Sequence, residues 1–319
     1  TPQYLEADRR YRQATTPEEQ LAALEEMMAT IPKHKGTEHM RADIRRRMAK
    51  VRTEAARQKT ASAKGPTWHH VPREGAGQVV LVGAPNTGKS RLLAALTHAS
   101  PVVAAYPFST RAPLPGMVPF EDVQVQLLDL PPIAPETEEP WLFALIRQAN
   151  GALLIADLGD DDVLSALEAT LEITARSRVQ LGQLGAGEGI VPTILVATKA
   201  DAEGAAGRLE IVREVYGERF PILAVSAETG EGVDALPRAL FELLRVIRVY
   251  TKAPGRRADR AVPFVLPQGA TVQDASAAVH KDFAERLKYA RIWGAQTFEG
   301  QMVQREHVLS DGDILELHT

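Results

Sequence analysis

Short apolar runs alternate with helical segments through the middle of the chain. Buried strands are predicted at Val79–Val82, Val123–Leu128, Gly151–Leu158, Val191–Ala197 and Ile222–Val225. Between them, apolar residues recur at helical spacing in Arg91–Leu96, Trp141–Ile146 and Val163–Ile173. Strands that alternate with helices predict an α/β domain with a doubly wound, mostly parallel sheet.

The N-terminal region predicts a helical hairpin. In the first helix, Leu21, Leu24 and Met28 share one face, and Ile31-Pro32 breaks the pattern. A second helix is expected from residue 37 to about residue 58. It has an apolar stripe spaced for packing on the first helix, namely Met40, Ile44, Met48 and Val51.

The second predicted helix is basic. Between residues 37 and 58 it contains seven Lys or Arg against three Asp or Glu, with Arg45, Arg46 and Arg47 in a row. Such a face is either a solvated helix surface or an electrostatic footprint for rRNA. The sequence leaves both alternatives open.

The C-terminal region predicts a small mixed domain. Strands are expected at Phe264–Leu266 and Asp313–Leu317, and Pro263 just before the first of them suits a strand start. Between them, Val272–Leu287 is expected to form one helix. No catalytic constellation is visible in this part, so it is either a binding module or a domain that only packs on its neighbour.

Composition narrows the class of protein. The chain has 319 residues, which suits two or three domains, and a net charge of -4. It contains no cysteine, which excludes a disulfide framework and a thiolate metal site. Without a membrane-spanning run or a signal pattern, we expect a cytoplasmic protein with no membrane partner. The acidic balance argues against nucleic-acid binding through bulk charge, and no DNA partner is expected.

A complete phosphate-binding loop follows the first predicted strand. Its residues are Gly83, Ala84, Pro85, Asn86, Thr87, Gly88, Lys89 and Ser90. The strand before the loop and the helix after it are the context that this motif requires. Backbone N–H groups of the loop and of the helix N-terminus attract phosphate. Lys89 is expected to reach the β- and γ-phosphates, and the Ser90 hydroxyl is expected to bind Mg²⁺.

Two later strand ends predict the base of the nucleotide. The first carries Thr198, Lys199 and Asp201. A carboxylate at Asp201 can accept from both the N1–H and the 2-amino group of guanine, a donor pair that adenine lacks. The second strand end carries Ser226, Ala227 and Glu228, where a small residue lets a backbone N–H approach the guanine carbonyl. Because ligands of open α/β sheets bind at the carboxyl ends of strands, GTP and GDP are the predicted ligands.

With these motifs in this order, the chain resembles the Obg branch of GTPases, and most of all the developmentally regulated GTP-binding proteins. The resemblance also rests on Ala105–Thr110, Leu127–Ile133, Arg248–Gly255 and His280–Gly294. It implies a helical region and linker over residues 1–76, a P-loop GTP-binding domain over 77–247, and a TGS domain over 248–319. A TGS domain is a β-grasp module, and the resemblance implies RNA or a protein as its target. The inserted domain of the family's eukaryotic and archaeal members has no counterpart here.

The resemblance also assigns the switch residues. Thr110 is the switch I threonine that engages Mg²⁺ and the γ-phosphate, and Asp129 holds Mg²⁺ through water. Pro132 stands where the family has a glycine whose N–H donates to the γ-phosphate. Since proline has no N–H, we expect a loss of about 1.5–3 kcal/mol in the preference for GTP over GDP.

The catalytic residues predicted are Lys89, Thr110 and Asn86. Ile133 stands where many GTPases have a glutamine that orients the attacking water, which implies slow intrinsic turnover. Related branches compensate with K⁺, and Asn86 occupies the loop position that ligates the ion in those enzymes. The alternative for Asn86 is a loop asparagine that tolerates an unusual φ.

Together these features predict a slow Mg²⁺-dependent GTPase associated with the ribosome, translation or RNA, for which an activating protein is a candidate partner. The alternative, favoured by Pro132, is a GTP/GDP-binding scaffold that docks on RNA or the ribosome and hardly hydrolyses GTP. A third alternative is an ATP-dependent enzyme, and Asp201 argues against it.

Overall fold

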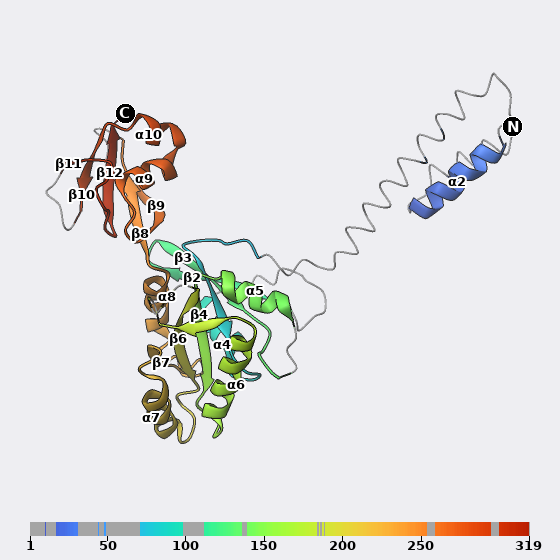
Figure 1. The fold of residues 1–319 in the computed structure, drawn as a ribbon, viewed down its shortest axis with the longest axis vertical. Coiled ribbons are helices and arrows are strands. Elements are labelled where there is room, and N and C mark those ends of the chain that lie inside the picture. Colours follow the sequence, from blue (N-terminus) through green and yellow to red (C-terminus); the bar gives the residue numbers. More distant parts are fainter. Residues whose placement is uncertain are drawn as a thin grey trace. The chain divides into compact units, whose positions relative to one another are not determined.

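The computed structural model describes residues 10, 17–30, 44, 48, 71–97, 112–135, 139–183, 185, 187, 189–253, 259–294 and 300–318. The chain divides into two compact units, residues 1–67 and 68–319. Figure 1 labels most of the elements of both units.

The first unit contains α2 (Pro17–Thr30), which is the expected first helix. Its buried residues are Ala23, Leu24 and Met27, and Ile44 is buried as the hairpin prediction requires. Met28, which was predicted to share a face with Leu24, is half-buried, whereas Met27 is fully buried three residues after Leu24. Most of the second predicted helix, including Arg45, Arg46 and Arg47, lies outside the described residues.

The larger sheet of the second unit confirms the predicted α/β class. Its strands are β1 (Gln78–Val82), β2 (Leu114–Phe120), β3 (Val123–Asp129), β4 (Gly151–Asp157), β5 (Gln180–Gly182), β6 (Ile190–Thr198) and β7 (Ile222–Ala224). The strand order is β2-β3-β1-β4-β6-β5, and β7 also pairs with β6. Every pair is parallel except β2 with β3, which form an antiparallel hairpin.

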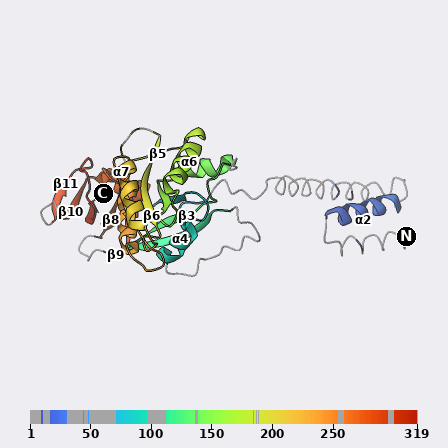
Figure 2. The same ribbon diagram turned by 90° about the horizontal axis from the view of Figure 1, so that it is seen from below.

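Helices cover both faces of this sheet. One core cluster joins the sheet to α5 (Pro140–Gln148), α6 (Val163–Arg176) and α7 (Ala205–Tyr216). The other joins it to α4 (Lys89–Thr97) and α8 (Leu236–Leu244), which follows the short 3-10 turn η2 (Val233–Ala235). Figure 2 shows α6 and α4 on opposite sides of the strands. Among the described residues, no helix combines the length and hydropathy needed to cross a membrane.

The C-terminal part forms a second sheet with more strands than the sequence indicated. Its order is β11 (Gln301–Val303), β10 (Tyr289–Trp293), β12 (Asp313–His318), β8 (Val246–Thr251) and β9 (Asp259–Pro267). Pro263 was expected just before a strand, but it lies inside β9. It is tolerated there because β9 is an edge strand whose pairing with β8 is irregular between Val249 and Thr251.

The single helix predicted over residues 272–287 is also wrong. The structure has two helices, α9 (Val272–Val279) and α10 (Lys281–Arg286), separated by His280. His280 has an extended backbone with φ -169°, and its ring Nδ1 accepts a hydrogen bond from the N–H of Asp282 at 3.2 Å. This local cap starts a new helix, which helical periodicity alone does not reveal.

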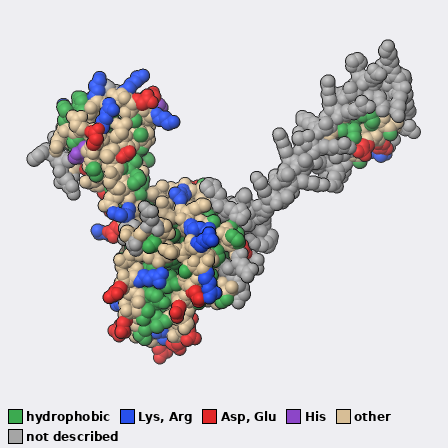
Figure 3. All heavy atoms as spheres, viewed as in Figure 1, with side chains coloured by type: hydrophobic (Ala, Val, Ile, Leu, Met, Phe, Trp, Pro, Cys, Tyr) green, Lys and Arg blue, Asp and Glu red, His purple; other side chains and the backbone are tan. Residues whose placement is uncertain are grey.

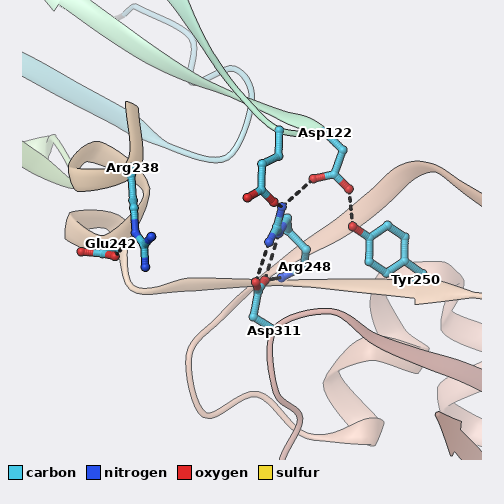
Figure 4. Close-up of polar contacts among 7 residues, drawn as sticks. Asp122, Arg238, Glu242, Arg248, Tyr250 and Asp311 are labelled. Atoms are coloured by element: carbon cyan, nitrogen blue, oxygen red, sulfur yellow. Dashed lines mark hydrogen bonds and ion pairs between the residues drawn. The ribbon is translucent and has the colours of Figure 1, made fainter. Parts of the chain in front are cut away.

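Arg248 holds the C-terminal sheet against the turn between β2 and β3. Its guanidinium, 12% exposed, pairs with Glu121 and Asp122 of that turn and with Asp311 at 2.7 Å (Figure 4). It also lies over the rings of Phe120 and Phe241, which stack on each other. The Tyr250 hydroxyl donates to Asp122. β8 therefore connects the two sheets and also supplies the residues that hold them together.

Candidate nucleotide site

The phosphate-binding loop closes one end of a pocket at the carboxyl end of β1. The pocket has a volume of about 540 Å³ and is lined by Pro85, Asn86, Thr87, Gly88, Lys89, Ser90, Arg91, Ala112, Asp129, Leu130, Pro131 and Pro132. The pocket brings the loop together with Asp129 and Pro132. Thr110, the predicted switch I threonine, lies outside the described residues.

The loop backbone leaves little freedom for other residues. Gly88 has φ +86°, a conformation that favours glycine. A Cβ at Gly83 would stand 3.0 Å from the backbone oxygen of Ile155, so with a side chain there the loop would have to move slightly away from β4. The Thr198 hydroxyl donates to the backbone oxygen of Thr87 at 2.8 Å and so ties the loop to the end of β6.

Lys89 is buried, with 7% of its surface exposed. Its Nζ donates to the backbone oxygens of Gly83 at 3.1 Å and Ala84 at 2.7 Å. Burial lowers the pKa of Lys89 to about 8, and the nearby charge of Asp129 opposes that shift. An anion in the pocket would add a charged partner to the two neutral carbonyl oxygens that now accept from this buried ammonium.

The predicted Mg²⁺ residues meet at the pocket wall. The Ser90 hydroxyl donates to the Asp129 carboxylate, whose other oxygen, Oδ1, is buried without a partner. Burial raises the pKa of Asp129, and the Ser90 hydrogen bond and the charge of Lys89 act in the opposite direction. A hydroxyl and an orphaned carboxylate oxygen beside a phosphate pocket fit Mg²⁺, which binds few protein oxygens and keeps water and phosphate ligands. In the described part of the chain, no cluster of three or more His, Cys, Asp or Glu offers a richer metal site.

The predicted base residues come together at the ends of β6 and β7. Backbone bonds join the two loops, from Val225 N–H to Ala197 at 2.8 Å and from Ala200 N–H to Val225 at 3.1 Å. Asp201 is hydrogen-bonded by the Ser226 hydroxyl, which is the main reason why its pKa is lowered. Lys199, with φ +56°, pairs with Asp157 at the end of β4. The ionised, exposed carboxylate of Asp201 can therefore accept hydrogen bonds from the N–H groups of a nucleotide base.

The neighbouring residues Pro132 and Ile133 differ in burial. Pro132 is exposed and lines the pocket, whereas Ile133 is 2% exposed and packs in the core beneath the sheet. The Ile133 N–H donates to the backbone oxygen of Gly83 at 3.0 Å. The isoleucine side chain is therefore a core residue in this structure and not a pocket residue.

Sequence reasoning missed Arg91 and Asp157. Arg91 lines the pocket in the first turn of α4 and pairs with Glu228 of the base loop. Its place directly after Ser90 was a visible signal, although nothing in the sequence indicated its partner. Asp157 could have been noticed only as the polar end of a predicted strand.

Comparisons with known proteins agree with the two folded parts. Residues 78–197 match the family model described as 50S ribosome-binding GTPase, and residues 247–319 match the TGS domain. An uncharacterized GTP-binding protein of Methanocaldococcus jannaschii is 27% identical, with 77% of this chain and 78% of the relative covered. Developmentally-regulated GTP-binding protein 1 of Xenopus laevis is also 27% identical, with 77% and 83% covered. The solved YchF GTPase of Schizosaccharomyces pombe shares the fold, with a TM-score of 0.51, 14% identity, and 78% of this chain and 100% of that chain covered.

Proposed function

We propose that the chain is a GTPase of the Obg branch that binds GTP and GDP and hydrolyses GTP slowly. It matches the family models of the 50S ribosome-binding GTPase and of the TGS domain, and it resembles the developmentally regulated GTP-binding proteins. The observation that carries the proposal is that one pocket contains both the buried ammonium of Lys89 and a buried Asp129 oxygen without a hydrogen-bond partner. The base carboxylate Asp201 stands at the same edge of the sheet. We assign residues 77–247 to the GTP-binding domain and 248–319 to the TGS domain.

Lys89 and the loop N–H groups carry the chemistry at the phosphates. Once phosphate enters, the Lys89 ammonium exchanges the carbonyls of Gly83 and Ala84 for β- and γ-phosphate oxygens. There it stabilises the negative charge transferred to the leaving group. Ser90, Asp129 and Thr110 would hold Mg²⁺, which neutralises phosphate charge when bound. Asp129 is the carboxylate among the described pocket residues, and its role at Mg²⁺ leaves no side-chain base for the attacking water, so we expect slow turnover.

Two residues of this site, Pro132 and Asn86, bear on the recognition of the γ-phosphate and on catalysis. Pro132 lines the pocket but has no N–H to donate to the γ-phosphate. We therefore expect a weaker preference for GTP over GDP than a glycine at this position would give. Asn86 lines the pocket, which places it beside the phosphates of a bound nucleotide. Its φ of +62° also fits the alternative, a loop asparagine that tolerates an unusual φ. We propose K⁺ as a second ion because Ile133, being buried, leaves the attacking water without an orienting side chain.

Guanine selection by Asp201 gives the test of this function. Asp201→Asn replaces one of the two acceptor oxygens with an amide donor, which stands opposite the 2-amino group of guanine. We expect about 100-fold weaker GTP binding and a gain for xanthosine triphosphate, which has an oxygen at that position. Fluorescence titration with labelled nucleotides measures both affinities.

The matched control for this variant is Asp282→Asn, which changes an exposed aspartate in α10, outside the nucleotide-binding part of the chain. It should leave both affinities unchanged. Retention of guanine selectivity in Asp201→Asn would contradict the assignment of this residue.

Association with the ribosome or RNA is a further part of the proposal. The description of the matching family and the presence of a TGS domain support it. Charge adds no support, because Figure 3 shows basic and acidic side chains interspersed on the visible face of the TGS domain. The competing function is a nucleotide-binding scaffold that hardly hydrolyses GTP, and Pro132 is the residue that favours it.

A further inference from the structure

An ion pair joins the phosphate pocket to the base loop. Arg91 lies in the first turn of α4 and lines the pocket, while Glu228 lies two residues after Ser226 in the base loop. Their charged groups meet, although the two residues are 137 positions apart in sequence. The pair therefore links two segments that would contact opposite ends of one nucleotide.

The pair contributes little to the stability of the fold. Its side chains are 66% and 59% exposed, and exposed pairs of this kind contribute little to folding because solvent screens them. Backbone hydrogen bonds from Val225 and Ala200 already fix the base loop on the end of β6. The pair lies beside the path of the ligand, which suits a role in nucleotide binding better than one in folding.

The charge of Arg91 also acts on the base carboxylate. The pKa of Asp201 is lowered mainly by the Ser226 hydrogen bond and, more weakly, by the positive charge of Arg91. One guanidinium thus borders the phosphate pocket and the base residues together. A nucleotide with its phosphates in the loop and its base at Asp201 must run beside this guanidinium.

We propose that Arg91 and Glu228 form a strap that holds the bound guanine nucleotide and slows its release. Arg91 is a positioning residue in this view: it closes the gap between α4 and the base loop along the ribose and α-phosphate. The strap rests on the proposed function, because it presupposes a guanine nucleotide in the pocket. The chemical step itself does not involve the pair.

Release of a fluorescent GDP analogue, chased with excess GDP, tests the strap in the full chain. We expect Arg91→Ala and Glu228→Ala each to speed release about threefold to fivefold, the upper range for an exposed pair. The double variant should release no faster than either single variant, because both remove the same link. The exchanged pair, Arg91→Glu with Glu228→Arg, should restore release to within about twofold of the starting protein.

The matched control is the exposed pair Arg176 and Glu172 on α6, with side chains 73% and 58% exposed. Alanine at either position should leave release unchanged. Unchanged release in Arg91→Ala, additive effects in the double variant, or slower release in Glu228→Ala would each overturn the strap while leaving GTP binding intact. Failure of the unmodified protein to bind the analogue would overturn the proposed function and the strap together.

Discussion

Lys89→Ala is expected to weaken GTP and GDP binding about 100-fold. The buried ammonium is the one side-chain cation in the described wall of the loop that would contact both β- and γ-phosphates, and a charge-assisted hydrogen bond contributes about 1.5–3 kcal/mol. Isothermal titration with each nucleotide in Mg²⁺ buffer measures the loss.

The same variant should not unfold the protein. Because burial lowers the pKa of Lys89 to about 8, its charged form is disfavoured in the folded, nucleotide-free protein. Alanine removes that unfavourable burial, so the thermal midpoint without nucleotide should not fall. Lys288→Ala, which changes an exposed lysine of the TGS domain, serves as the control and should leave affinity unchanged. Unchanged GTP affinity in Lys89→Ala would contradict the assignment of this pocket.

Arg248→Ala should release the TGS domain from the turn between β2 and β3. The Arg248 side chain is 12% exposed and forms ion pairs with Glu121, Asp122 and Asp311 (Figure 4). Breaking a buried pair costs about 3–5 kcal/mol, and partial exposure of the carboxylates reduces this to about 2–3 kcal/mol. Calorimetry should resolve two unfolding transitions, with the TGS transition moved to lower temperature.

The ion pair of Arg238 and Glu242, also drawn in Figure 4, provides the control for Arg248→Ala, because the Arg238 side chain is 78% exposed. Arg238→Ala should leave the calorimetric trace unchanged. A single transition at the original temperature in Arg248→Ala would show that the carboxylates do not depend on this arginine.

Acid should weaken the same contact. Burial alone would raise the pKa of Asp122 and Asp311, but hydrogen bonds from Tyr250 and Arg248 to Asp122, and from Arg248 to Asp311, outweigh it, so both pKa values are lowered. Their contribution to stability is therefore complete above the ordinary aspartate pKa of about 4 and is lost as the pH falls toward the lowered values. The difference in unfolding free energy between the unmodified protein and Arg248→Ala should shrink over that range.

The predictable part of the fold followed from local patterns. The buried strands β1, β4 and β6 are short apolar runs, and the loop from Gly83 to Ser90 has residues that only one local geometry suits. The sequence also placed Asp129 and Asp201 at strand ends, and the structure places both at the carboxyl edge of the sheet.

The remainder depended on contacts distant in sequence or on single caps. The break at His280 comes from one ring nitrogen, which leaves the helical periodicity intact. Strands β10 and β11 of the TGS sheet are short and only partly apolar, so no run marked them. Arg248 pairs with Glu121 and Arg91 pairs with Glu228 across more than 120 residues of chain, and no local pattern specifies such pairs.

Single-turnover hydrolysis of GTP with Mg²⁺, compared in potassium and sodium buffers, tests the central claim most directly. We expect slow conversion of bound GTP to GDP and phosphate, faster in potassium because Asn86 offers the ion a ligand beside the phosphates. Bound GTP that stays intact in both salts would contradict the GTPase assignment and favour the scaffold.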